Sequence, residues 1–289
     1  MDVVNPTKRF WIDWFSGRDL VLATKHGKEQ VIRPLVDERL GARSRIQKEL
    51  DTDLLGTFTG EVERSYDPLT TVRLKCEMAL DLSGADLAIA TEGSFGPHPQ
   101  FGIIPLHEEI VFLLDRKNHL EVFHVERTSD TNFLREEVHS STDLLELAQR
   151  AGFPDHALIL RDVDNVQIIH KAIQDPSLLM KTFEDLHQGH RPVSVETDMR
   201  AHLNPTRMKV IEKATIGLIE RLNHTCPNCA SPGFGMEKRI PGLPCSQCGL
   251  PTRSPKGETL QCPKCGHQKD VFYEKTQFED PMNCDYCNP

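Results

Sequence analysis

The sequence has few of the features that mark a membrane or secreted protein. None of its apolar runs approaches the roughly 20 residues that a membrane-spanning helix needs. We also expect no secretory leader, because the polar residues Asp2, Lys8 and Arg9 interrupt the start of the chain. We therefore expect a cytoplasmic protein that has no membrane partner and whose cysteines stay reduced.

Positive charge is also scarce. The 34 Lys and Arg residues face 43 Asp and Glu residues, which gives a formal net charge of −9 over 289 residues. An acidic surface repels a phosphate backbone, so we do not expect a nucleic-acid partner. The segment from Cys226 to Pro289 does not reverse this balance, since it carries seven basic and seven acidic side chains. Nucleic-acid binding through the C-terminal segment is thus disfavoured.

Cysteine, in contrast, is concentrated in four Cys-x-x-Cys pairs near the C-terminus. Such a pair can direct both sulfurs at one ion, about 2.3 Å from each. Eight thiols in four pairs match two structural zinc sites, whereas a disulfide framework or a redox dithiol fits a reduced chain less well. The expected ligands are Cys226, Cys229, Cys245, Cys248, Cys262, Cys265, Cys284 and Cys287.

The pairing of these units is open. A glycine follows both Cys248 and Cys265, as in zinc-ribbon knuckles, and Pro255-Lys256-Gly257 between them is typical of a hairpin turn. We therefore predict a nested arrangement in which the two middle pairs share one ion and the two outer pairs share the other. Sequential pairing along the chain is the alternative.

The rest of the chain alternates short apolar strands with amphipathic helices. This pattern predicts an α/β fold, a central mixed sheet with flanking helices, followed by a double zinc-ribbon module. We expect an N-terminal segment over 1–19, an α/β domain over 20–222 and the ribbon module over 223–289. The expected strands are 20–24, 86–91, 109–115, 120–126, 157–160 and 192–197, and the expected helices are 31–40, 68–83, 141–151, 177–187 and 205–222.

Polar loops follow three of these strands, the position at which open α/β sheets bind ligands. The first loop places Lys25, His26 and Lys28 at the start of a helix, where an anion such as phosphate is favoured. In the second, 91–99, Glu92 stands at the strand tip, where its carboxylate could bind Mg²⁺ or act as a base, and His98 could add a ligand or a general acid. A solvated polar loop and a structural histidine are the plain alternatives.

The third loop, 196–207, contains Asp198 and Arg200 on one side of an extended chain. Arg207 follows in the first turn of a helix, where a cation opposes the helix macrodipole. We predict that Asp198 takes part in catalysis and that Arg200 and Arg207 bind phosphate. These side chains should then converge with Lys28 and Glu92 at one end of the sheet, while local ion pairing is the alternative.

Three motifs together resemble an uncharacterised bacterial family of unknown function. They are the segment Glu92–Pro99, the stretch Thr197–Arg207 and the four terminal cysteine pairs. The resemblance extends over nearly the whole chain and implies no known activity.

Residues 20–95 also resemble the inosine/xanthosine triphosphate pyrophosphatase superfamily. Those enzymes begin with a strand, Ala-Thr-x-Asn, a lysine and a helix, and the segment Ala23–Lys28 stands in that place, with His26 at the asparagine position. Their later Ala-Asp, strand and metal-binding acid correspond to Ala85–Glu92. The resemblance implies Mg²⁺-dependent hydrolysis of a phosphoanhydride, for example in a nucleotide. The alternative is a zinc-ribbon protein that recognises a ligand or a protein partner without turnover.

Overall fold

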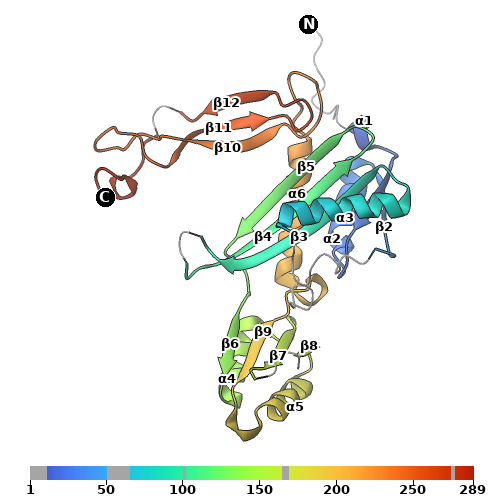
Figure 1. Cartoon of the computed structure of the whole chain (residues 1–289), viewed down its shortest axis with the longest axis vertical. Helices are drawn as coiled ribbons and strands as arrows, with labels where there is room; N and C mark the ends of the chain where they lie inside the picture. The colour runs from blue at the N-terminus through green and yellow to red at the C-terminus, as the bar shows by residue number, and fades with distance from the viewer. Residues whose placement is uncertain (1–11, 51–65, 100–101, 165–168, 275–276) are drawn as a thin grey trace.

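The computed structural model describes residues 12–50, 66–99, 102–164, 169–274 and 277–289. Figure 1 shows a central sheet with helices on both faces, a smaller α/β lobe at one end and a narrow three-stranded ribbon projecting from the other. The predicted fold class is confirmed, because a mixed sheet flanked by helices precedes a module with two four-cysteine clusters. Within these described ranges, no helix is long and apolar enough to cross a membrane.

The central sheet has five strands in the order β2-β1-β3-β4-β5. The first three run parallel to one another, and β4 and β5 extend the sheet as an antiparallel hairpin. The strands are β1 (Asp19–Ala23), β2 (Arg43–Ile46), β3 (Leu87–Pro97), β4 (Pro105–Asp115) and β5 (Leu120–Thr128).

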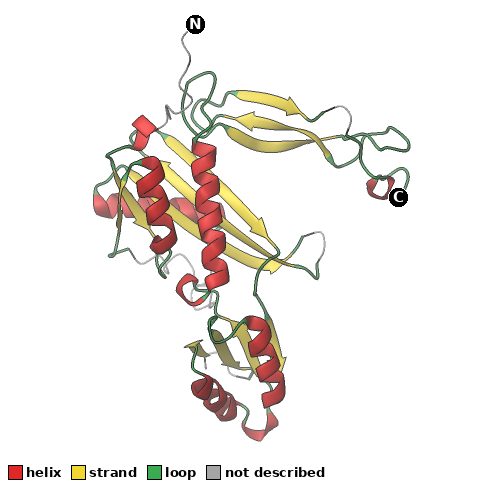
Figure 2. Ribbon diagram, turned by 180° about the vertical axis from the view of Figure 1, so that it is seen from behind, coloured by secondary structure: helices red, strands yellow, loops and turns green. Residues whose placement is uncertain are grey.

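Helices cover both faces of this sheet (Figure 2). Alternate strand residues such as Leu20, Ile89 and Leu113 pack with α2 (Glu29–Leu40) and α6 (Pro205–Leu222) in one apolar cluster. Their neighbours, which point to the opposite face, pack with α3 (Pro68–Ser83) in a second cluster. The two-residue period of a strand therefore divides the core into two layers. A short helix, α1 (Ile12–Phe15), adds Phe15 to the first layer.

Helix α3 shows how local sequence sets an element's limits. Asp67 is its N-cap, since its carboxylate accepts from the backbone N–H groups of Leu69 and Thr70. Pro68 stands at the first helical position and Gly84 ends the helix in the left-handed conformation, as the sequence predicts.

Strand β3 departs from the prediction. The sequence indicated a strand that ends at Thr91 and a tight loop over 91–99, but β3 continues to Pro97. The reason is its partner: β4 pairs with it residue by residue, from Leu87 opposite Asp115 to Pro97 opposite Pro105. Glu92 therefore lies in the middle of a strand and not at a strand tip.

A second sheet forms the smaller lobe, in the order β6-β9-β7-β8. It has its own apolar cluster, which includes Leu147, Leu160 and Phe183. The predicted segment 20–222 thus contains two sheets, and the predicted domain boundaries stay a prediction. The elements of the lobe are β6 (Arg135–Val138), α4 (Ser141–Ala151), β7 (Leu158–Asp162), β8 (Ile169–Ile173), α5 (Pro176–Leu186), η2 (Gln188–His190) and β9 (Val193–Thr197), and η3 (Ala201–Leu203) connects it to α6.

The ribbon is an antiparallel sheet of β10 (Gly235–Pro241), β11 (Pro255–Gln261) and β12 (Gln268–Phe272), followed by η4 (Pro281–Asn283). Pro255-Lys256-Gly257, expected to be a hairpin turn, is instead the beginning of β11. The ribbon is anchored to the body near its first cysteine pair. There Arg221 of α6 donates hydrogen bonds to the carbonyls of Phe123 and Gly233, at 2.9 and 3.3 Å.

Candidate functional site

Two clusters of four cysteines lie in the ribbon. We call Cys226, Cys229, Cys262 and Cys265 the inner centre, because it adjoins the body, and Cys245, Cys248, Cys284 and Cys287 the outer centre. Sulfur–sulfur distances of 3.6 and 3.8 Å occur in the inner centre and of 3.7 and 3.8 Å in the outer one. A tetrahedral zinc site with bonds of about 2.3 Å places its sulfurs about 3.8 Å apart. Both clusters therefore have the dimensions of a four-cysteine zinc site.

The cysteine pairs alternate between the centres, so the nested prediction and its sequential alternative are both wrong. Strand direction explains the result. The first pair precedes β10 and the third follows β11, and in antiparallel strands these two positions lie at the same end of the sheet. Strand β12 then returns the chain to the other end, where the fourth pair meets the second. Alternation follows directly from three antiparallel strands with a knuckle at each end.

The knuckles at Cys226, Cys245 and Cys262 share one backbone pattern. In each, the cysteine N–H donates to the carbonyl five residues later, and the N–H four residues later donates back to the cysteine carbonyl. This turn forces the fourth residue into the left-handed region, which Gly249 and Gly266 adopt easily. Ala230 holds the same conformation with φ of 57° and carries a side chain there.

The two centres differ in the groups that surround their sulfurs. In the inner centre the Ser231 hydroxyl lies 3.0 Å from Cys229 Sγ and 3.2 Å from Cys262 Sγ. Asn228 Nδ2 also donates to Cys265 Sγ at 3.6 Å. In the outer centre the backbone N–H of Gln247 donates to Cys245 Sγ, but within the described chain no side chain donates to an outer sulfur.

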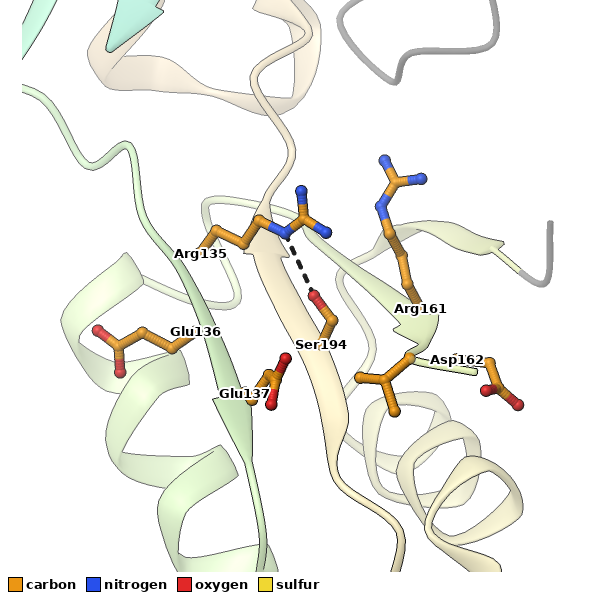
Figure 3. A pocket seen from close by; sticks show the side chains of 7 residues that line it. Arg135, Glu136, Glu137, Arg161, Asp162 and Ser194 are labelled. Carbon is orange, nitrogen blue, oxygen red and sulfur yellow. Dashed lines mark hydrogen bonds between the residues drawn. The ribbon is translucent and has the colours of Figure 1, made fainter. Parts of the chain in front are cut away.

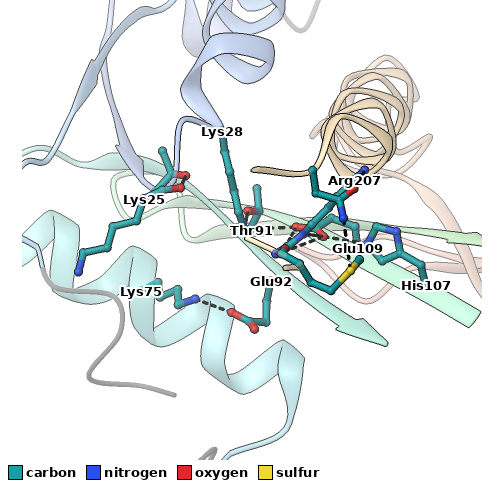
Figure 4. Close-up of polar contacts among 11 residues, drawn as sticks. Lys25, Lys28, Lys75, Thr91, Glu92, His107, Glu109 and Arg207 are labelled. Carbon is teal, nitrogen blue, oxygen red and sulfur yellow. Dashed lines mark hydrogen bonds and ion pairs between the residues drawn. The ribbon is translucent and has the colours of Figure 1, made fainter. Parts of the chain in front are cut away.

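A second polar site is buried in the body, where three elements meet at Glu109 of β4 (Figure 4). Lys28, the N-cap of α2, donates from Nζ to Thr91 Oγ1 at 2.7 Å and to Glu109 Oε1 at 3.3 Å. Arg207 of α6 donates to the same carboxylate from Nε and Nη2, at 3.2 and 3.1 Å. His107 Nε2 lies 3.1 Å from Glu109 Oε2. We call these residues the buried ion network.

This network lies almost wholly out of contact with solvent. Lys28 is 6% exposed, Arg207 is 1% exposed, and Glu109 and His107 are fully buried. The ring of Phe95 covers it, stacked on His107 at 4.3 Å and 5.4 Å from the Arg207 guanidinium. Charges that are buried in this way interact strongly, and removing one partner destabilises the protein because the other charge stays buried and unpaired.

Gly93 makes room for the network. It lies opposite Glu109 in the β3–β4 pair. A Cβ atom there would lie 2.4 Å from Glu109 Oε2 and 2.6 Å from Arg207 Nη2. Any side chain at this position would therefore push the ion pair apart.

Burial and charge act in opposite directions on the two ends of the network. Burial lowers the pKa of Lys28 to about 8, although the charge of Glu109 favours the ammonium. Burial alone would raise the pKa of Glu109, but the charges of Arg207 and Lys28 outweigh it and hold that pKa below its usual range. Glu109 is therefore ionised, and Lys28 is the group of this pair that titrates near neutral pH.

The opposite face of β3 carries a second ion pair. Glu92 points toward α3, where Lys75 Nζ donates to its carboxylate, and both side chains are nearly buried. Lys28, which donates to Thr91, and Glu92 thus lie at the same end of the sheet but on its opposite faces. The charges of Glu92 and Lys75 both act on the pKa of Lys28. Figure 4 also shows Lys25, on the loop after β1.

The other predicted residues make contacts with different partners. Asp198 is fully buried and pairs with Arg200, whose Nη2 lies 2.6 Å from Asp198 Oδ2. His26 adopts a left-handed conformation with φ of 64°, and its ring stacks on that of His202 at 5.1 Å. The backbone N–H of His98 donates to Ile104 across the β3–β4 hairpin, about 20 Å along the strand from Glu92.

The structure therefore brings together Lys28 and Arg207, as predicted, but through Glu109, which the sequence interpretation missed. His107 and Thr91 of this network were missed as well, and so was Lys75, the partner of Glu92. A usable signal exists for Lys75, because it shares a helical face with Val72, Cys76 and Ala79, all of which are buried. A charged residue on an apolar stripe needs a buried partner. For Glu109 the signal is weaker, since charged residues also begin solvent-exposed strands.

A cavity of about 350 Å³ opens on the lobe (Figure 3). Arg135 Nε donates to Ser194 Oγ at 3.4 Å on its wall. Arg161 also lines it and is held by Glu196. Because carboxylates of Glu137 and Asp162 share the wall with these arginines, the cavity has no clear preference for an anion or a cation.

Comparisons with known proteins place the chain in a family without assigning an activity. No curated protein matches the chain. A family model described as a domain of unknown function, DUF6671, matches residues 75–289, which include the second half of α3, the ion pairs Lys75–Glu92 and Arg207–Glu109, the lobe and the ribbon. The match begins after β1 and α2, so Lys25 and Lys28 lie outside it. Since the match covers most of the sequence, the chain belongs to the DUF6671 family.

Proposed function

We propose that this protein binds a phosphate-bearing small molecule where β1 and β3 approach the N-terminus of α2, and that it hydrolyses a phosphoanhydride bond of that molecule. The observation that carries the proposal is the hydrogen bonding of Lys28. An ammonium has three N–H donors, and Thr91 and Glu109 occupy two of them. Among the described residues the third has no partner, and a phosphate oxygen could accept it.

The surroundings of Lys28 support an anionic ligand. Lys28 is the N-cap of a 12-residue helix, so the positive end of the helix dipole lies at the start of the same segment. Lys25 and Lys75 add positive charge at the same end of the sheet. Glu109 and Arg207 fix the position of Lys28, so that little entropy is lost when a ligand binds.

A divalent ion would complete the catalytic site, with Glu92 as its protein ligand. Mg²⁺ is commonly held by one or two carboxylates together with water and substrate phosphates, so a single glutamate is compatible with it. When bound, the ion would neutralise charge on the transferred phosphoryl group. Lys75 would have to leave Glu92, and a phosphate oxygen is the natural acceptor for its ammonium. The catalytic roles of Asp198 and His98, and phosphate binding by His26 and Arg200, remain predictions.

The second candidate is a zinc-ribbon protein that binds a ligand or a protein partner without turnover. The Lys75–Glu92 pair favours it, because a carboxylate already neutralised is a poorer metal ligand. The ribbon also exposes large apolar side chains that a protein partner could cover, among them Phe272, Phe278 and Met282.

The test uses the full chain with two zinc ions, Mg²⁺, and pyrophosphate and nucleoside triphosphates as probes. Affinity is measured by calorimetry and turnover by phosphate release. Lys28→Met should weaken binding by about 10-fold to 100-fold, the value of a charge-assisted hydrogen bond. Lys117→Met, at an exposed lysine, is the matched control.

Glu92→Gln should abolish turnover and leave binding measurable. Binding without turnover in the unaltered protein would select the second candidate. Failure of every probe to bind would defeat the phosphate site itself.

A further inference from the structure

We propose that the outer centre is the site at which peroxides modify this protein. Its thiolates would be oxidised to a disulfide and one zinc ion released, while the inner centre keeps its metal. The inference is independent of the proposed function and concerns only the cysteines and their neighbours.

Hydrogen bonds to the sulfurs are the first argument. A donor to a metal-bound thiolate withdraws electron density from it, lowers its nucleophilicity and holds it in position. The inner centre has two side-chain donors: the single O–H of Ser231, which lies within reach of Cys229 Sγ and Cys262 Sγ, and the amide of Asn228, which donates to Cys265 Sγ. The outer centre has no such side-chain donor in the described chain, so its thiolates keep more of their reactivity.

Accessibility does not account for the difference. Each centre has two buried cysteines, Cys226 and Cys262 in one and Cys245 and Cys284 in the other. The remaining two in each centre are more accessible. An oxidant can therefore reach both centres, and the hydrogen bonds decide which one reacts.

Packing is the second argument. Phe234 and Leu260 pack against the inner centre, and Gly233 brings it against Val122 of β5. The outer centre lies at the far end of the ribbon in Figure 1, among exposed side chains that include Leu250 and Tyr286. Local opening should cost less free energy there, because fewer apolar contacts are lost.

The chemistry balances with hydrogen peroxide as the oxidant. Two thiolates, for example those of Cys248 and Cys284 with sulfurs 3.7 Å apart, give up two electrons and form one S–S bond. The O–O bond of the peroxide breaks, and with two protons it yields two water molecules. The zinc ion loses two ligands and leaves as a hydrated ion.

The experiment begins with the full chain loaded with two zinc ions and treated with hydrogen peroxide. Zinc release is followed with a chromogenic chelator, and disulfides are mapped by peptide mass spectrometry. We expect one equivalent of zinc to leave about 10-fold faster than the second, with disulfides confined to the outer cysteines. Simultaneous release, or disulfides first in the inner centre, would overturn the proposal.

Exchanging the donors between the centres tests the cause. Leu250 occupies the position of Ser231, because Cys245 N–H donates to its carbonyl as Cys226 N–H does to that of Ser231. Gln247 likewise corresponds to Asn228. Leu250→Ser with Gln247→Asn should slow release from the outer centre, and both positions are exposed enough to accept the change.

The reciprocal variant, Asn228→Ala with Ser231→Ala, should bring the inner rate close to the outer one. Zinc content of two per chain before oxidation shows that each variant has folded. Unchanged rates in the Leu250→Ser, Gln247→Asn variant would refute the role of the hydrogen bonds even if the reciprocal variant fails to load zinc.

Discussion

The ribbon and the α/β body each enclose a set of charged groups, but they hold these groups in different ways. In the ribbon, eight cysteines lie in pairs only three residues apart, and few apolar side chains surround them. In the body, Lys28, Glu109 and Arg207 come from distant parts of the chain and meet inside a large apolar core. From this comparison we predict that metal supplies the order of the ribbon, whereas packing supplies the order of the body, on which the ion network depends.

Zinc removal should give the largest effect and separate the two regions. A structural zinc site contributes about 10–16 kcal/mol of apparent binding free energy, which the small apolar cluster of the ribbon cannot replace. With a chelator present, limited proteolysis should cut within 223–289 while the body to about Leu222 stays intact. Cooperative loss of both regions would show that the body also depends on the metal.

Neutralising Glu109 should be the most damaging single change in the body. Glu109→Gln leaves Lys28 and Arg207 buried without their shared carboxylate, which should cost about 3–5 kcal/mol. Urea unfolding of the zinc-loaded chain measures the change. Glu108→Gln, on the neighbouring and more exposed residue, is the control and should cost less than about 1 kcal/mol.

Titration of Lys28 should make the stability of the body depend on pH. The folded pKa of about 8 is below the unfolded value of about 10.4, so between these values the unfolded chain binds the extra proton. The free energy of unfolding should therefore rise as pH increases from about 8 to 10.4, by at most about 3 kcal/mol. Lys28→Met should remove this rise, and an identical pH profile in that variant would assign it to another group.

Adding one methyl group at Gly93 should disturb the network without removing a charge. Gly93→Ala places a Cβ against Glu109 and Arg207, and we expect a loss of about 1–3 kcal/mol in urea unfolding. Gly96→Ala is a matched control on the same strand, because no atom lies within 4 Å of the added Cβ. Equal losses in both variants would point to strand entropy and not to the ion pair.

The smallest effect should occur in the first knuckle of the ribbon. Ala230→Gly relieves a left-handed conformation that costs an alanine about 1 kcal/mol. Zinc affinity of the inner centre should rise slightly, by up to about fivefold, in a competition titration with a chelator. Gly266→Ala in the third knuckle should lower it by a similar factor.

The same contrast explains what the sequence could predict. Helix caps such as Asp67 and Gly84, and the ligand identity of every ribbon cysteine, depend on residues a few positions apart. The cysteine pairing was mispredicted because it depends on strand direction over about 60 residues, and Pro255-Lys256-Gly257 suggests a turn where the sheet requires a strand. Glu109 was missed because its partners Lys28 and Arg207 reach it only when α2 and α6 pack on the same face of the sheet.

The alternation of the cysteine pairs also limits how such a ribbon can be exchanged between proteins. A break anywhere between Cys229 and Cys284 separates the ligands of at least one centre, and a break between Cys248 and Cys262 separates both sets. Sequential pairing would have allowed division into two halves that each keep a metal site. This ribbon can be gained, lost or transplanted by recombination only as one piece.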